Sequence, residues 1–122
     1  WGHAKDYVEA MWLMLDANTP DDYVVSSGIT TSVKKFIEIT LDKLGFNYEW
    51  TGDGINNSLI DKKTSKEIIK IDKSLYRPAE VDLLIGDSSK IRNKLKWNPL
   101  YSLENLIDDM INFEISNSDF NF

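Results

Sequence analysis

The 122-residue sequence has no cysteine and only one histidine, His3. Without cysteine, neither a disulfide framework nor a thiolate metal site can form, and a single histidine excludes most zinc sites. A Ser-His-Asp catalytic arrangement would have to use His3. We expect His3 to be structural, because no second histidine or cysteine can join it, and we predict no metal site in this chain.

Long apolar runs are also absent, since none approaches the roughly 20 residues of a membrane span, and no signal peptide is visible. We therefore expect a cytoplasmic protein without a membrane partner. With a formal net charge of −6, the chain has too few spare cations for general nucleic-acid binding. A phosphate-bearing ligand would have to be held by a local cation. The length fits one domain with one core, residues 1–122.

The spacing of apolar residues predicts four helices. The first covers residues 5–17, and its apolar face is expected in the core. That face consists of Val8, Met11, Trp12 and Leu15. The second helix ends before Gly45, which stands where a left-handed C-cap belongs. The third follows Ser88 and has a basic face expected to be solvated, while the fourth is capped by Ser102. The tail, residues 116–122, is expected to fray.

Four short stretches of β-branched or alternating apolar residues predict strands. They are residues 23–27, 46–50, 67–72 and 81–85. The polar segment 51–65 contains two glycines and is interpreted as a loop with room for a short hairpin. No internal repeat and no linker divides the chain. The fold class predicted from this pattern is a small mixed α/β domain.

The most unusual stretch runs from Tyr76 to Asp82. Pro78 removes a backbone donor and pushes Arg77 into an extended conformation, so that the arginine side chain is presented. Glu80 follows three residues later on the same stiff segment. One interpretation is that Arg77 binds an anion while Glu80 binds sugar hydroxyls. The other is a surface ion pair between the two side chains, and spacing alone favours this second interpretation.

Catalytic and cofactor motifs are missing from the chain. Short-chain dehydrogenases need a tyrosine followed four residues later by lysine, and no tyrosine here is followed in that way. The residues at that position are Met11, Ser27, Gly52, Glu80 and Asn105. The run Gly52-Asp53-Gly54 resembles the start of a phosphate loop, but no helical pattern follows it, so the dinucleotide fingerprint fails. The paired carboxylates Asp21-Asp22 and Asp108-Asp109 are interpreted as solvated charges. We predict no catalytic and no cofactor-binding residue in this chain.

Several stretches together resemble one family, the GDP-mannose 4,6-dehydratases. The two specific ones are Trp1-Gly2-His3-Ala4-Lys5-Asp6-Tyr7-Val8-Glu9-Ala10-Met11-Trp12 and Tyr76-Arg77-Pro78-Ala79-Glu80-Val81-Asp82, the latter followed by Leu84-Ile85-Gly86-Asp87 and Lys90. Weaker matches in the same order are Ser32-Val33-Lys34-Lys35-Phe36 and Leu95-Lys96-Trp97-Asn98-Pro99. The resemblance runs from Trp1 to about Met110. It departs from the family at Lys96, where a glycine is usual, and in the variable segment 56–66.

That family belongs to the extended short-chain dehydrogenases. The resemblance implies that the full-length protein is an NADP-dependent lyase, a homo-oligomer that converts GDP-mannose to GDP-4-keto-6-deoxymannose. This product is a precursor of fucose and related deoxysugars. The resemblance places this chain as the C-terminal substrate-binding lobe, with the Rossmann half, the bound NADP and the catalytic residues upstream of Trp1. Carried over, Arg77 contacts the diphosphate and Glu80 the guanosine ribose hydroxyls.

Two other interpretations stay open. The chain could be a stand-alone nucleotide-sugar binding or interaction module without catalysis; a Tyr-x-x-x-Lys pair and a glycine-rich strand-turn-helix upstream of Trp1 would exclude this. It could also be another extended dehydratase or epimerase with a different nucleotide-sugar, against which the run from Trp1 to Val8 argues. If strands of the sheet are supplied from upstream, exposed apolar surface and an unpaired strand edge should follow.

Overall fold

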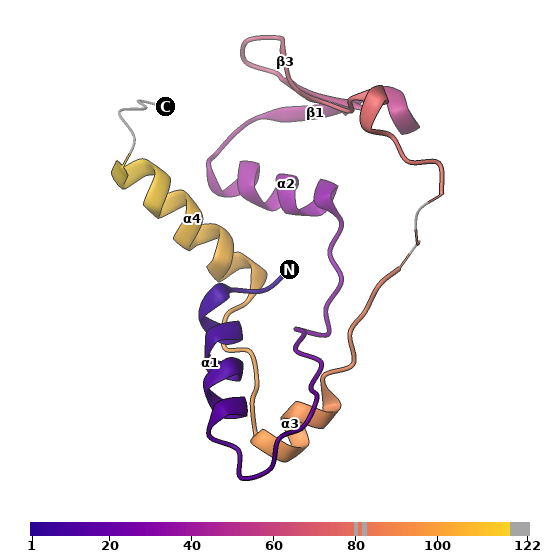
Figure 1. Cartoon of the computed structure of the whole chain (residues 1–122). Helices are drawn as coiled ribbons and strands as arrows, with labels where there is room; N and C mark the ends of the chain where they lie inside the picture. Colours follow the sequence, from indigo (N-terminus) through magenta and orange to yellow (C-terminus); the bar gives the residue numbers. More distant parts are fainter. Residues whose placement is uncertain (80, 82, 118–122) are drawn as a thin grey trace. The chain divides into compact units, whose positions relative to one another are not determined.

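The computed structural model describes residues 1–79, 81 and 83–117. Within these ranges the chain forms four α-helices, two short 3₁₀ turns and a three-stranded sheet, so the predicted mixed α/β fold is confirmed (Figure 1). In chain order the elements are α1 (Ala4–Leu15), α2 (Val33–Lys43), β1 (Tyr48–Thr51), η1 (Gly54–Asn56), β2 (Ser58–Asp61), β3 (Lys66–Lys70), η2 (Lys73–Leu75), α3 (Ser89–Leu95) and α4 (Leu103–Asn117). None of the described helices is long and apolar enough to cross a membrane.

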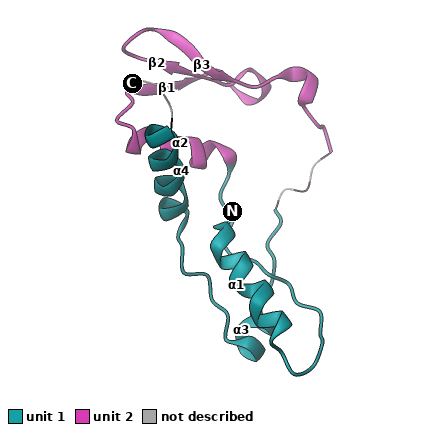
Figure 2. Cartoon of the chain, turned by 60° about the vertical axis from the view of Figure 1, so that its left-hand side comes forward, with its two compact units in different colours: residues 1–32, 83–122 teal, residues 33–82 magenta. Residues whose placement is uncertain are grey.

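The chain divides into two compact units (Figure 2). Unit 1 combines residues 1–32 with residues 83–122 and contains α1, α3 and α4. Unit 2 is residues 33–82 and contains α2, the sheet and both 3₁₀ turns. Unit 1 is therefore assembled from two separate segments of sequence, whereas unit 2 is one continuous segment.

The sheet of unit 2 is an antiparallel meander in the order β1-β2-β3. Its central strand β2 buries Leu59 completely, and the ladder between β2 and β3 shifts register next to this residue. β1 and β3 confirm the strands predicted near residues 46–50 and 67–72. The segment 51–65, predicted as a loop with room for a short hairpin, contains β2, which pairs antiparallel with β1 and β3. The two apolar residues of β2 are too few to produce a periodic signal. Gly45 has φ of +71° after α2, which confirms the predicted left-handed C-cap.

The face of α1 that packs in unit 1 is not the one that the sequence indicates. Ala10 has no exposed surface and packs with Ile91 of α3 and with Trp97, while Asp6 on the same face of α1 is 4% exposed. The predicted core face is instead exposed: its members Val8, Met11, Trp12 and Leu15 are between 51% and 81% accessible. A small residue at position 10 lets the large Trp97 ring approach the helix closely, and this contact decides which face is buried.

Neither of the strands predicted for unit 1 forms. Residues 23–27 lie outside any ladder, and so do residues 81 and 83–85; Asp82 lies outside the described residues. A strand needs hydrogen bonds to the backbone of a neighbouring strand. In the described part of unit 1 these two segments are instead joined by hydrogen bonds from side chains to the backbone. The Ser26 hydroxyl donates to the Gly86 carbonyl at 2.6 Å. At Gly86 a Cβ atom would come within 2.8 Å of the Ser26 side chain, so glycine permits this close approach.

The two C-terminal helices follow the sequence more closely. Ser102 caps α4 as predicted, with its hydroxyl oxygen accepting a bond from the Asn105 N–H at 3.2 Å. α4 continues through Asn117, so residues 116 and 117 are helical and not frayed, and residues 118–122 lie outside the described part. The basic face of α3 is exposed as expected: the Lys90 and Lys94 side chains are 45% and 58% accessible, and both also bind the Asp21 carboxylate, at 2.6 and 2.9 Å.

Candidate functional site

The segment that carries Arg77 begins with a stabilised turn in unit 2. The Asp72 carboxylate accepts bonds from the Ser74 N–H at 2.8 Å and from the Ser74 hydroxyl at 2.7 Å, which closes the turn η2. These bonds, the hydroxyl first, lower the pKa of Asp72 below its usual value. Tyr76 then leaves the turn with φ of −67° and ψ of 128°. Pro78 favours an extended conformation for Arg77, the residue that precedes it.

A pocket of about 680 Å³ opens beside this turn. Its wall is formed by Val33, Ile71, Asp72, Leu75, Tyr76, Arg77 and Pro78. The wall is mainly apolar, with one cationic and one anionic side chain. This composition suits a ligand that carries both a charged group and an apolar or aromatic face.

Arg77 is exposed on the wall of this pocket, as the sequence predicts for a presented side chain. Within the described ranges, no hydrogen-bond acceptor or carboxylate engages its guanidinium. Glu80, the second predicted site residue, lies outside the described residues. A guanidinium is charged at all physiological pH values and offers a planar set of donors that matches phosphate oxygens. The arrangement can therefore bind an anion through Arg77.

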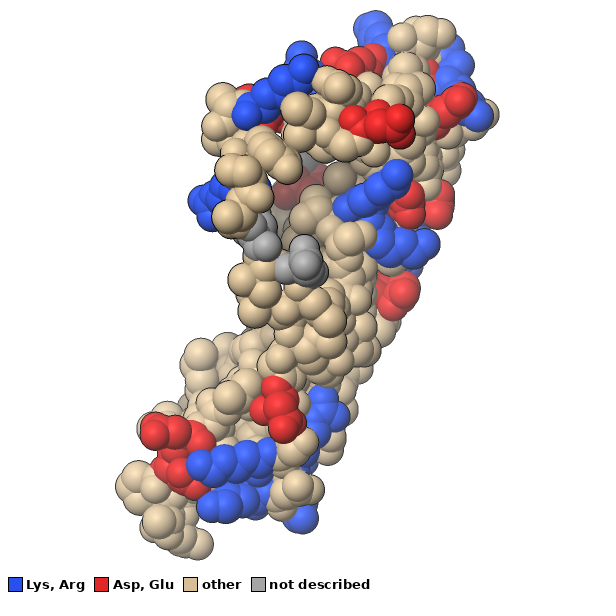
Figure 3. Space-filling view, turned by 90° about the vertical axis from the view of Figure 1, so that its right-hand side faces the viewer, with Lys and Arg blue, Asp and Glu red and all other residues tan. Residues whose placement is uncertain are grey.

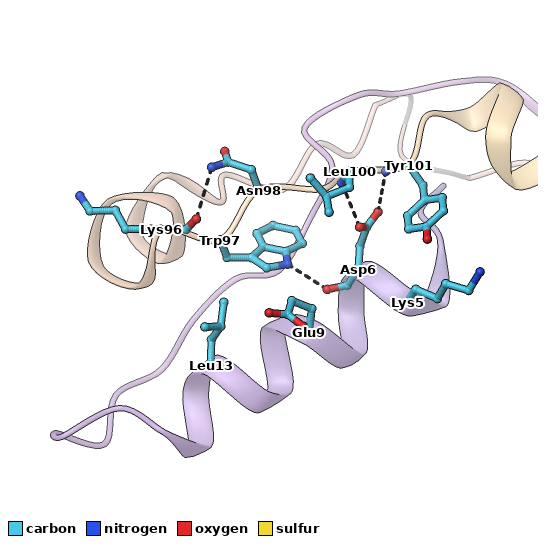
Figure 4. A pocket seen from close by; sticks show the side chains of 9 residues that line it. All are labelled: Lys5, Asp6, Glu9, Leu13, Lys96, Trp97, Asn98, Leu100 and Tyr101. Carbon is cyan, nitrogen blue, oxygen red and sulfur yellow. Dashed lines mark hydrogen bonds between the residues drawn. The ribbon is translucent and has the colours of Figure 1, made fainter.

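A second group of polar residues joins two distant segments within unit 1 (Figure 4). The buried Asp6 carboxylate accepts the backbone N–H groups of Leu100 and Tyr101, at 2.9 and 3.2 Å. The Trp97 indole donates to the Asp6 carbonyl at 2.8 Å. A shallow groove of about 450 Å³ lies over this joint, between α1 and the segment 96–101. Because all the buried polar atoms of the joint satisfy one another, we assign it an architectural role.

His3 lies next to this joint and is buried, as the structural role predicted for it requires. Its Nδ1 atom accepts the N–H of Lys5 at 3.1 Å and so caps α1. The Nε2 atom lies 3.1 Å from the Asp109 carboxylate of α4, and the ring stacks on Tyr101 at 4.2 Å. The contact with His3 is the main cause that lowers the pKa of Asp109. His3 thus connects α1, α4 and the segment between α3 and α4.

The joint is not evident from the sequence, because an acidic residue such as Asp6 near a helix start is ordinarily explained by the helix dipole. A charged residue on the packing side of a helix is rare and marks a buried carboxylate with partners, but the sequence indicates the opposite face of α1 as the packing side and so hides this signal. Charge elsewhere is mixed. Figure 3 shows one face of the molecule on which Lys and Arg side chains lie beside Asp and Glu side chains, without a broad patch of one sign on that face.

Comparison with known proteins decides the family. A sequence profile described as "GDP-mannose 4,6 dehydratase" matches residues 1–110. The chain is 41% identical over 116 residues to the GDP-mannose 4,6-dehydratase of Sinorhizobium fredii, covering 95% of this chain and 33% of that protein. It is 42% identical to the Cricetulus griseus GDP-mannose 4,6 dehydratase and 41% identical to the human one, in each case over 94% of this chain and 31% of the relative.

The chain belongs to the GDP-mannose 4,6-dehydratase family. It spans about a third of the length of the curated relatives that it matches, and the match falls on their C-terminal portion. Two stretches that carry the resemblance in the sequence meet in space: the stretch from Trp1 to Trp12 supplies Asp6, and the stretch from Leu95 to Pro99 supplies Trp97. The family-like stretches therefore form the architectural joint of unit 1.

The departure at Lys96 has a structural explanation. Lys96 is the C-cap of α3 and has φ of +58°, in the left-handed region that glycine adopts without strain. The glycine that the resemblance leads us to expect at this position would fit this backbone without strain. The lysine keeps the left-handed cap, so the departure at Lys96 leaves the end of α3 unchanged.

The residues present do not fit a dinucleotide loop. The run Gly52-Asp53-Gly54 enters the 3₁₀ turn η1 and then β2. A dinucleotide site needs the glycines to open an α-helix whose N-terminus faces the pyrophosphate. In addition, the described residues contain no group of three or more His, Cys, Asp or Glu side chains placed to hold a metal ion.

Proposed function

We propose that this chain is the nucleotide-sugar-binding portion of a GDP-mannose 4,6-dehydratase, and that Arg77 binds the diphosphate of GDP-mannose. The full-length enzyme would use NADP to form GDP-4-keto-6-deoxymannose, with both the cofactor and the catalytic residues held outside this chain. The observation that carries the proposal is the exposed guanidinium of Arg77 on the wall of a 680 Å³ pocket. Membership of the family and the names of the relatives support it.

The role of Arg77 in this proposal is binding and orientation. A diphosphate lies far from the sugar carbons that react, so a contact to it holds the ground state and the transition state alike. Glu80 would accept hydrogen bonds from the ribose hydroxyls, as the resemblance implies. The pocket belongs to unit 2, in which nine Lys and Arg residues balance nine Asp and Glu residues, so Arg77 does not have to overcome a local excess of negative charge.

The test is calorimetric titration of GDP and GDP-mannose into the chain and its variants. Arg77→Ala should lower the affinity for both ligands roughly tenfold to a hundredfold, because a charge-assisted contact contributes about 1.5–3 kcal/mol. Arg77→Lys should restore only part of the affinity, since an ammonium cannot make the bidentate contact. Lys73→Ala is the matched control, because it removes a neighbouring cation that does not line the pocket. If Arg77→Ala binds GDP as the unaltered chain does, the proposed role is wrong.

A further inference from the structure

We propose that Tyr76 is the base-binding residue of the Arg77 pocket, and that its ring stacks on the purine base of the ligand. This inference rests on the proposed function and assigns the base, the part of the ligand that neither Arg77 nor Glu80 is proposed to hold. The starting observation is that Tyr76 and Arg77 are consecutive in sequence and yet line the same pocket.

The backbone conformation explains how both side chains reach one pocket. In a β-strand, neighbouring side chains point to opposite faces. Tyr76 has φ of −67° and ψ of 128°, which is close to polyproline II geometry. In that geometry successive side chains are separated by about a third of a turn, because the helix has three residues per turn. The ring and the guanidinium can therefore border one ligand at two adjacent points.

The chemistry of the remaining wall fits a flat apolar ligand face. Tyr76 is 56% exposed and Leu75 is 76% exposed, although both are large apolar side chains in a pocket wall. Val33 and Ile71 continue the same wall from other parts of unit 2. An exposed aromatic ring beside a cation is the combination that binds nucleotides, in which the base stacks and the phosphate is paired. The volume of 680 Å³ is within the range of small-ligand pockets, about 300–1,000 Å³.

The turn before Tyr76 places the ring before the ligand arrives. The Tyr76 N–H donates to the Lys73 carbonyl at 3.4 Å, and the Asp72 cap fixes the start of the same turn. Pro78 restricts the backbone on the other side of the pair. A ring that is held in this way loses little conformational freedom on binding, which favours affinity.

The experiment compares GDP with inorganic pyrophosphate, each titrated into the chain and into its variants. Tyr76→Ala should lower the affinity for GDP about tenfold, which is within the contribution of stacking on an aromatic ring. The affinity for pyrophosphate should stay unchanged. Tyr76→Phe should bind GDP like the unaltered chain. Ile68→Ala is the control, because Ile68 is an exposed apolar residue of β3 outside the pocket. The Tyr76 ring protons should also move upfield in the NMR spectrum when GDP is added.

The outcomes separate the two proposals. If Arg77→Ala lowers the affinity for both GDP and pyrophosphate while Tyr76→Ala lowers neither, Arg77 keeps its proposed role and the stacking inference is wrong. If Tyr76→Ala weakens GDP and pyrophosphate equally, Tyr76 only supports the turn, and the inference is also wrong. If the unaltered chain binds neither ligand, or Arg77→Ala changes nothing, the proposed function fails together with the inference.

Discussion

The two units of the molecule differ in how they are held together. Unit 2 is a continuous segment whose sheet is formed by neighbouring strands, so its interactions are mostly local in sequence. Unit 1 unites two segments that the whole of unit 2 separates, and side-chain hydrogen bonds join them: Asp6 to Leu100, Trp97 to Asp6, and Arg92 to the Ser27 carbonyl. The family-like motifs of unit 1 therefore build a joint, whereas the motif at Arg77 in unit 2 borders a pocket.

The two units also differ in their net charge. The entire formal net charge of −6 belongs to unit 1, which has eleven acidic and five basic residues, while unit 2 is formally neutral. In unit 1, Asp6, Asp21 and Asp109 all accept bonds from neighbouring groups. In unit 2, Arg77 is the cation on the wall of the largest pocket described. An anionic ligand should therefore bind unit 2 better than unit 1, whereas these acidic side chains of unit 1 stabilise unit 1 itself.

The largest expected effect is the loss of the joint in unit 1 alone. Trp97 is 2% exposed and packs with Ala10 and Ile91. Trp97→Ala should lower the free energy of unfolding by about 3–5 kcal/mol, through lost burial and the cavity left behind. Amide hydrogen exchange should then accelerate in α1 and α3 while the sheet of unit 2 keeps its protection. Urea unfolding and exchange measured by NMR provide the two readouts.

Trp12→Ala is the control for this experiment, because Trp12 is an α1 residue that is 67% exposed. It should change stability by no more than about 0.5 kcal/mol. Equal losses for the two tryptophans would show that the outer face of α1 is packed in solution. A sheet that loses protection together with α1 would show that the two units unfold as one.

An intermediate effect is expected from the two non-glycine residues with positive φ among those that the structure describes, one in each unit. Lys96 has φ of +58° at the end of α3, and Ser65 has φ of +57° in the turn between β2 and β3. Lys96→Gly should raise the free energy of unfolding by about 0.5–1 kcal/mol, because glycine removes the steric cost of the left-handed conformation. Ser65→Gly should act in the same direction in unit 2. Thermal unfolding measures both changes.

The matching variant Lys96→Ala should bring no gain, because alanine retains the Cβ atom that causes the strain. If alanine stabilises the chain as much as glycine does, the lysine side chain itself is unfavourable and the backbone is not the cause. A gain at Ser65 without a gain at Lys96 would place the strain in unit 2 alone.

The smallest expected effect is a pH dependence of unit 1 through Asp21. Its pKa is lowered, chiefly by hydrogen bonds from Lys90 and then from Lys94. The ionised carboxylate therefore stabilises the fold fully above the unfolded pKa of about 3.9, and this contribution is lost as the pH falls through the lower folded value. Asp21 in turn raises the pKa of Lys94, so the contribution of Lys94 is complete below about pH 10 and is lost above its folded pKa.

Asp21→Asn should accordingly destabilise the chain slightly at neutral pH, with a difference that shrinks as the pH falls below about 4 and that also shrinks in high salt. Urea midpoints between pH 2 and pH 7 measure this difference. Asp16→Asn is the control, because Asp16 is an exposed carboxylate that follows α1. A difference that stays constant over the whole range would mean that Asp21 acts through packing and not through charge.

The sequence predicts the elements of unit 2 better than those of unit 1, for a physical reason. β1, β3 and the C-cap at Gly45 depend on alternation and local backbone preference, which a single sequence displays. The strand predicted at residues 23–27 fails because its formation depends on a partner strand, which local pattern does not reveal. The choice of the buried face of α1 depends on Trp97, which lies far away in sequence. Interactions between distant residues are therefore what the sequence alone did not supply.

The candidate site shows the same division. Pro78 makes Arg77 predictable as a presented side chain, because a proline acts on its own neighbour. The membership of Tyr76 in the same pocket depends on the turn η2 and on Val33, more than 40 positions earlier in the chain. Local spacing alone favours an ion pair of Glu80 with Arg77, and the role of Glu80 toward ribose, which the resemblance implies, stays a prediction because this residue lies outside the described residues.

The insertion of unit 2 between the halves of unit 1 has a consequence for the order of folding. The bonds of Asp6 to Leu100 and Tyr101 close a loop that contains all of residues 33–82. Closing a flexible loop of this length costs roughly 4 kcal/mol of chain entropy. A folded unit 2 replaces most of that loop by a compact body and so reduces the cost of bringing the two halves together. Unit 2 should therefore fold first, and refolding of unit 1 should slow when the sheet is destabilised.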